Sequence, residues 1–240
     1  MEAIGIDFGT TNSLVAFYNG VEAQVVPIDV APDQWAPYGF DDVMPSIIAR
    51  DQESRICFGW EAKRHSEGRF EAVKRLFATQ LDHAISDDGD AIAVEEVATM
   101  LFAELRRRAI ANGIEARQAV ITVPANSKGR ARHRTKICAG MAGFEVLTLI
   151  NEPTAAAMAY AQRHPESRQL LVFDWGGGTL DVTLLHNVDG VFIEQASAGV
   201  PRSGGLDFDA RLEKLIRSLA PSLSNLDARD RHGFKIEVEL

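Results

Sequence analysis

The chain has 240 residues, of which 46% are hydrophobic, and this is enough for a sizeable core in one large domain or in two smaller lobes. Its formal net charge of −9 argues against nucleic acid as a main partner, because such binding depends on Lys and Arg neutralising phosphates. Cys57 and Cys138 show neither metal-ligand spacing nor a disulfide framework, and neither a signal peptide nor a long apolar run is present. The composition therefore indicates a cytoplasmic protein with no membrane partner.

The first predicted element is an apolar strand that begins at Ile4, ends at Asp7 and enters the turn Gly9-Thr10-Thr11. A second strand, Leu14 to Tyr18, follows this turn. Asn19-Gly20 then predicts a tight hairpin turn, because type I′ turns need positive φ at both central positions. A third strand from Val21 to Val26 completes the meander.

The next segments are predicted to be a long loop and a helix. Prolines and aspartates between Ile28 and Met44 indicate an exposed loop, in which we expect Trp35 and Tyr38 to be packing anchors rather than a binding surface. Phe70 to Leu81 has a helical pattern, and nothing in that pattern marks Lys74 as more than a surface charge.

Two helices and two strands are predicted next. An apolar stripe from Ile92 to Ala111 predicts a helix that packs on the core. Gln118 to Val123 reads as a buried strand ended by Pro124, and Asn126 or Ser127 is expected to cap the following helix, which extends to about Ala142. The basic residues of this helix are spaced by two, which scatters them around it and favours a solvated face.

The strand Val146 to Ile150 leads into Asn151-Glu152-Pro153, where proline at the first helical position predicts a helix start. The positive end of that helix faces the strand tips. Glu152 either stabilises this helix end or takes part in a site.

The stretch from Leu170 to Leu185 reads as strand, glycine turn, strand. Glycines at 176 to 178 carry no Cβ, so their amides can close around a phosphate. Asp174 and Asp181 lie beside this turn, and carboxylates are tolerable next to phosphate only with a cation between them, for which Mg²⁺ is the usual choice. A plain β-hairpin is the alternative from this stretch alone.

The same device occurs twice, since an apolar strand ending in Asp and followed by a glycine turn and threonine stands at both Asp7 and Asp174. The second copy also has a hairpin turn, Asp189-Gly190, before the strand Val191 to Ala196. Two copies are too few for a solenoid. They predict two related lobes that present their turns to a shared cleft.

The last predicted elements are two helices. Gly204-Gly205 precedes a helix from Asp207 to about Leu219, and glycine amides at a helix start suit an anion or a ribose edge. Asp207 can equally be an N-cap. The final segment, Asp227 to Leu240, is charged and reads as helical.

Four motifs together resemble the nucleotide-binding domain of the Hsp70 chaperones, which belongs to the actin-like ATPase superfamily. They are Asp7-Phe8-Gly9-Thr10-Thr11-Asn12-Ser13, Asn151-Glu152-Pro153-Thr154-Ala155-Ala156-Ala157, Phe173-Asp174-Trp175-Gly176-Gly177-Gly178-Thr179-Leu180-Asp181-Val182 and Gly204-Gly205-Leu206-Asp207-Phe208-Asp209. The resemblance implies an α/β, actin-like ATPase (ribonuclease H-like) fold, with two lobes of mixed sheets flanked by helices. Lobe I would be residues 1–165 and the first part of lobe II residues 166–240.

The resemblance also implies the site residues. The phosphates of ATP or ADP would be held by Gly9, Thr10, Thr11, Asn12, Gly176, Gly177, Gly178 and Thr179, with Gly204 and Gly205 also binding the nucleotide. Mg²⁺ would be held mostly through water by Asp7, Asp174 and Asp181, and K⁺ is a further ion that the family allows. The implied catalytic set is Asp7, Lys74, Glu152, Asp174 and Thr179. Lys74 would orient the water that attacks the γ-phosphate in line.

By the same resemblance, the rest of lobe II, an interdomain linker and a peptide-binding domain would follow, so we expect a partial form of the domain. The segment between Lys74 and Glu152 is shorter than in typical members, so we expect a small subdomain of lobe I to be reduced. The family's usual contacts with co-chaperones and exchange factors are then expected to be reduced as well. Two alternatives stay open: a non-catalytic remnant or interaction module with the same fold, and an actin-like filament-forming ATPase. A sugar kinase is disfavoured, because no second-substrate catalytic Asp motif is present.

Overall fold

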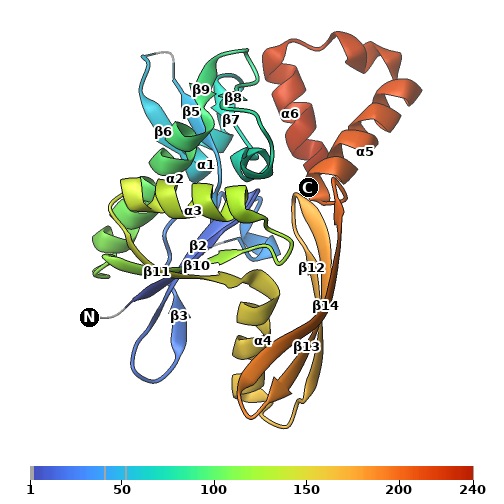
Figure 1. Ribbon diagram of the computed structural model, residues 1–240. Coiled ribbons are helices and arrows are strands. Elements are labelled where there is room, and N and C mark those ends of the chain that lie inside the picture. The colour runs from blue at the N-terminus through green and yellow to red at the C-terminus, as the bar shows by residue number, and fades with distance from the viewer. Residues whose placement is uncertain (1–2, 41, 52, 240) are drawn as a thin grey trace.

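The computed structural model describes residues 3–40, 42–51 and 53–239. It shows an α/β architecture with a large mixed sheet, flanking helices and a separate three-stranded sheet (Figure 1). The predicted fold class is therefore confirmed. We keep the names lobe I for residues 1–165 and lobe II for residues 166–240.

The main sheet of lobe I has the order β11-β10-β1-β2-β3, with β4 also paired to β2. Its strands are β1 (Ile4–Phe8), β2 (Asn12–Tyr18), β3 (Ala23–Val25), β4 (Met44–Pro45), β10 (Gln118–Val123) and β11 (Glu145–Asn151). β1 pairs with β10 in parallel and with β2 antiparallel, so the sheet is mixed. The third strand is shorter than the predicted 21–26.

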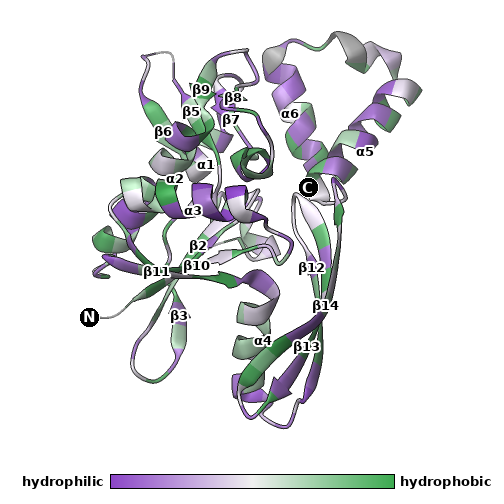
Figure 2. Cartoon of the chain, viewed as in Figure 1, coloured by the Kyte–Doolittle hydropathy of each residue, from purple (hydrophilic) through white to green (hydrophobic). Residues whose placement is uncertain are grey.

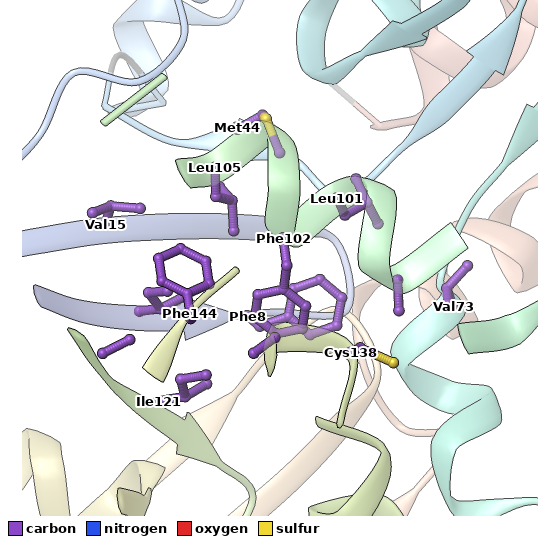
Figure 3. Packing of buried hydrophobic residues seen from close by; sticks show 14 of the residues in the cluster. Phe8, Val15, Met44, Val73, Leu101, Phe102, Leu105, Ile121, Cys138 and Phe144 are labelled. Atoms are coloured by element: carbon purple, nitrogen blue, oxygen red, sulfur yellow. The ribbon is translucent and has the colours of Figure 1, made fainter. Parts of the chain in front are cut away.

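The core of lobe I lies between this sheet and helices α2 (Val94–Ala111) and α3 (Gly129–Met141), as Figure 3 shows. Alternate residues of β1 point into it, and Phe8 stacks on Phe102 with 4.4 Å between ring centroids. Since Phe8 immediately follows Asp7, core packing fixes the backbone from which this site residue projects.

A smaller part of lobe I contains short elements: η1 (Ala36–Tyr38), β5 (Ile48–Arg50), β6 (Ile56–Phe58), α1 (Gly59–Lys63), β7 (Arg69–Phe70), η2 (Val73–Ala78), β8 (His83–Ile85) and β9 (Ala91–Ala93). The predicted helix from Phe70 to Leu81 is wrong. Phe70 pairs with Ile48 in a sheet, and Ala72 has φ of 54°, so only the 3₁₀ turn η2 forms. Sheet pairing outweighs the local helical pattern here.

The loop before Met44 is anchored by aromatic packing. Trp35 is buried against Phe40 and Trp60, with ring centroids 5.8 and 5.5 Å away, and Lys63 Nζ lies 4.5 Å from its centroid. Trp35 is therefore a packing anchor as predicted, whereas the prediction for Tyr38 is wrong because that side chain is 61% exposed.

Helix α3 departs from its prediction in two ways. Its N-cap is Lys128 without a side-chain cap bond, and Asn126 instead bonds to Asp181. The basic face is only partly solvated, because Arg134 is buried and pairs with Glu95 at 2.7 Å. A buried arginine with a carboxylate partner avoids the cost of an unpaired charge.

Lobe II contains the antiparallel sheet β12-β13-β14, with β12 at Gln169–Trp175, β13 at Thr179–Val188 and β14 at Val191–Pro201. Helix α4 (Glu152–Arg163) packs against strands of both sheets and links the lobes (Figure 1). Then come α5 (Gly205–Leu219), η3 (Pro221–Asn225) and α6 (Ala228–Glu239). Exposed and half-buried residues alternate along β12, and the exposed ones include Leu171, Phe173 and Trp175. Figure 2 shows both hydrophobic and hydrophilic positions along the strands of this sheet.

Of the helices in the part of the chain that the structure describes, none combines the length and apolar character needed to cross a membrane.

Candidate functional site

The two glycine turns, one from each lobe, are in direct contact. A Cβ added to Gly177 would lie 2.2 Å from Thr11 Cγ2, and one added to Gly178 would lie 2.7 Å from Thr10 Oγ1. These distances are shorter than real Cβ contacts, so only glycine permits this approach. The predicted meeting of the two turns therefore occurs.

The peptide groups of the second turn are oriented by helix α5. The N–H groups of Gly205 and Leu206 donate to the carbonyl oxygens of Gly176 and Gly177, each at 3.1 Å. Because C=O and the following N–H point in opposite directions across a planar peptide, the N–H groups of Gly177 and Gly178 face away from α5. Among the described residues, neither has an acceptor, and successive free amides of this kind make an anion-binding nest.

The first turn offers matching donors. The N–H groups of Thr10 and Thr11 likewise have no acceptor within the ranges that the structure describes. Buried backbone donors are rarely left unsatisfied in proteins, so amides exposed at the junction of two lobes are suited to an anionic ligand.

Gly204 lies against the second turn, because a Cβ there would be 2.4 Å from the carbonyl carbon of Gly177. Gly204 is the N-cap of α5, and its N–H donates to Asp207 Oδ2 at 3.1 Å. Asp207 is thus at the third helical position, so the alternative that Asp207 is itself the N-cap is wrong.

Lys74 and Glu152 form an ion pair at the junction. Lys74 Nζ lies 2.6 Å from Glu152 Oε1, and their side chains are only 12% and 17% exposed. Burial raises the pKa of Glu152, and the charges of Asp7 and Asp174 act in the same direction while Lys74 opposes them. The four side chains therefore share one electrostatic environment.

Asp174 adds further negative charge to this environment. Burial raises its pKa, and the carboxylates of Asp7 and Asp181 contribute in the same direction. Asp174 and Asp181 stand directly opposite each other on β12 and β13, an arrangement that is unfavourable for like charges. These carboxylates therefore outnumber the one lysine that acts on them.

Hydrogen bonds hold two of the carboxylates in place. Asp7 Oδ1 accepts from Thr122 Oγ1 at 2.8 Å. Asp181 accepts from Asn126 Nδ2 and from Thr179 Oγ1, both at 2.8 Å. In the described ranges, no three His, Cys, Asp or Glu side chains are grouped to hold a metal directly.

A cavity of about 430 Å³ adjoins the turns. Its walls include Thr10, Thr11, Asn12, Gly176, Gly177 and Gly205 on one side and Trp35, Phe40, Trp60, Lys63, His232 and Ile236 on the other. Helix α6 contacts lobe I at this cavity through Lys63–Glu239 at 2.6 Å and Lys235–Glu71 at 2.7 Å. The cavity is large enough for part of a small ligand that also touches the turns.

The structure thus brings predicted site residues of both lobes together at one junction. Sequence patterns missed Arg75, Thr122 and Asn126, which bond to the site residues from lobe I. Their contacts cross between distant segments, and no local spacing signals them. Arg75 is distinguished only by its place next to Lys74.

A family model described as Hsp70 protein matches residues 78–234, which is more than half of the chain. The matched range includes Glu152, Asp174, the glycines at 176 to 178 and Gly204, whereas the first turn precedes it.

Proposed function

This chain belongs to the Hsp70 family, and on that premise we propose that it is an ATP-binding and ATP-hydrolysing domain of Hsp70 type. Hsp70 proteins are chaperone-type ATPases that bind nucleotide. The observation that carries the proposal is the contact between the two glycine turns, whose N–H groups are free and which follow Asp7 and Asp174, the two acids that act on the Lys74–Glu152 pair.

Phosphate binding is assigned to the backbone amides of the two turns. Amides that are already oriented cost little reorganisation when they receive a phosphate, and each hydrogen bond to a charged oxygen is stronger than a neutral one. Thr10 and Thr11 from lobe I and Gly177 and Gly178 from lobe II provide these donors. Phosphate binding would therefore favour closure of the lobes.

Mg²⁺ fits the donor set around the turns. Asp7, Asp174 and Asp181 supply oxygen, the ligand type that Mg²⁺ prefers. Together with Glu152 they carry more negative charge than the positive charge of Lys74 can offset. When bound, Mg²⁺ supplies positive charge that offsets the phosphates and these carboxylates. We assign Asp7 and Asp174 to its water shell, and Asp181 to the support of Thr179.

Lys74 is assigned to the positioning of the attacking water. Its ion pair with Glu152 holds the ammonium group in one place at the junction. A fixed cation next to the phosphates orients a water molecule and stabilises charge that develops during transfer of the phosphoryl group.

Calorimetric titration of the chain with Mg·ADP and Mg·ATP, together with a phosphate-release assay, tests the proposal. We expect saturable binding that is lost in EDTA, and release of phosphate from ATP above the background of the Lys74→Ala variant. Absence of binding would refute the proposal. Binding without release would instead identify a non-catalytic module, and nucleotide-dependent light scattering would identify a filament-forming protein.

A further inference from the structure

Arg75 belongs to lobe I, but its guanidinium group reaches lobe II. Its Nη2 donates to the carbonyl oxygens of Gly177 and Gly178, each at 3.1 Å, and to Asp207 Oδ2 at 2.5 Å. Its side chain is 28% exposed and that of Asp207 is 18% exposed. One side chain therefore contacts both the glycine turn and the start of α5.

These contacts influence the orientation of the phosphate-binding amides. Each carbonyl that Arg75 binds belongs to a peptide plane whose N–H points the opposite way. Holding the carbonyls of Gly177 and Gly178 thus turns the N–H groups of Gly178 and Thr179 away from Arg75. A guanidinium is suited to this role because it is always charged, and its Nη2 group alone contacts all three acceptors.

Asp207 makes the contact charge-assisted. It also accepts the N–H of Gly204, so it joins the cap of α5 to Arg75. Burial alone would raise the pKa of Asp207, but the bonds from Arg75 and from the Gly204 N–H hold it below its ordinary value. The carboxylate is therefore ionised at neutral pH and pairs with the guanidinium.

Arg75 is also the immediate neighbour of Lys74 in the sequence. It follows Lys74 directly in η2, so the lysine on the catalytic side and the arginine on the turn side are set by the same short segment. A shift of lobe II away from lobe I would stretch the Arg75 bonds. It would also change the distance from Lys74 to the turn.

We propose that Arg75 is a positioning residue that holds the glycine turn of lobe II in register with Lys74, so that the phosphate-binding amides are oriented before the ligand arrives. The part that concerns nucleotide rests on the proposed function. The part that concerns the turn is independent of it.

Three variants test this proposal. Arg75→Met removes the charge and the hydrogen-bond donors, and Arg75→Lys keeps the charge. Arg106→Met is the matched control, because Arg106 Nε donates to the carbonyl of Ala116 at 2.9 Å entirely within lobe I. Urea unfolding of all three gives the general effect on stability. Should Arg75→Met fail to fold, Arg75→Lys carries the comparison.

Hydrogen exchange without nucleotide examines the turn itself. In Arg75→Met we expect the hydrogen-bonded amides within the segments 176–179 and 204–208, namely those of Gly176 and of residues 204–208, to exchange about 10-fold faster than in the parent, as follows from the loss of one charge-assisted hydrogen bond. Amides of β1 and β10 should be unchanged. In Arg106→Met the two segments should exchange at the parental rate. Equal exchange of the two segments in Arg75→Met and in the parent would overturn the proposal.

Titration with Mg·ADP and with adenosine examines the consequence for binding. Arg75→Met should weaken Mg·ADP about 10-fold and leave adenosine affinity unchanged, with Arg75→Lys in between. Parental Mg·ADP affinity in Arg75→Met would refute the positioning role. If the parent itself does not bind Mg·ADP, the proposed function fails, and the exchange experiment alone decides the role of Arg75.

Discussion

Lys74 Nζ and Glu152 Oε1 are 2.6 Å apart, although the two residues lie in η2 and at the first turn of α4. The pair is largely withdrawn from solvent, which overturns the interpretation of Lys74 as a surface charge. Removal of either partner leaves the other charge buried alone, and such a loss costs more than the pair itself contributes.

Lys74→Ala should affect stability and turnover through separate causes. We expect the free energy of unfolding to fall by about 1–3 kcal/mol, because Glu152 loses its partner. Phosphate release should fall about 100- to 1,000-fold while Mg·ADP affinity stays near that of the parent, since the lysine acts mainly in the transition state. The double variant Lys74→Met/Glu152→Gln should regain stability but not rate. A parental rate in Lys74→Ala would show that this lysine is not catalytic.

Asp174→Asn should weaken the use of Mg²⁺ without unfolding the chain. The substitution removes one of two carboxylates that oppose each other on β12 and β13, so the stability of the nucleotide-free form should hold or rise. Titration of ADP binding with Mg²⁺ should give a clearly higher half-saturation concentration than in the parent. Identical Mg²⁺ dependence would exclude Asp174 from the cation site.

The raised pKa of Asp174 predicts a pH effect of definite sign. The folded form keeps the Asp174 proton to higher pH than the unfolded form does, so its contribution to stability is lost as pH rises through the raised folded pKa. The parent should therefore be less stable than Asp174→Asn at about pH 7. The difference in the free energy of unfolding between the two proteins should become smaller as pH falls toward the ordinary aspartate pKa of about 3.9.

Urea unfolding of the nucleotide-free proteins across this range provides the measurement. Asp189→Asn, in the exposed β13–β14 turn, is the control and should show no such trend. A difference in unfolding free energy between parent and Asp174→Asn that does not change with pH would contradict the prediction.

Alanine substitutions at Gly204 and at Gly176 should differ sharply in their effects. Gly204→Ala places a Cβ 2.4 Å from the backbone of Gly177, which cannot move without displacing the turn, so we expect a loss of about 1–3 kcal/mol and weaker Mg·ADP binding. Gly176→Ala meets no atom within 4 Å and should change stability by less than about 0.5 kcal/mol. Thermal unfolding and calorimetry distinguish them. Equal effects would mean that the turn and α5 are not in close contact.

Local chemistry explains most of what the sequence predicted correctly. Asp189 and Gly190 have φ of 50° and 86°, as expected for the turn residues that precede β14. At the Asn19-Gly20 hairpin turn only Gly20 has positive φ, so the predicted type I′ turn does not form there. The side-chain Oδ1 of Asn19 instead accepts the N–H groups of Val21 and Glu22. Turn residues act within a few positions, so their effect is readable without tertiary information.

Tertiary contacts explain what the sequence missed. Phe70 belongs to a strand because Ile48 is available as its partner, and Arg75 bonds to Gly177 because the two lobes meet. Neither partner is within reach of a local pattern. The residue bounds of the two lobes and the roles of the site residues stay predictions for the experiments above to test.

The pairing of β1 with β10 places Ile4 next to Ala119, whereas each strand of the β12–β13–β14 sheet pairs with its immediate neighbour in the chain. Contacts between distant positions require a long loop to close first, and they slow folding. During synthesis, the sheet of lobe I therefore stays incomplete until β10 has emerged, while lobe II can form its meander as soon as residues 169–201 are free. We expect refolding to be limited by the closure of lobe I around its first strand.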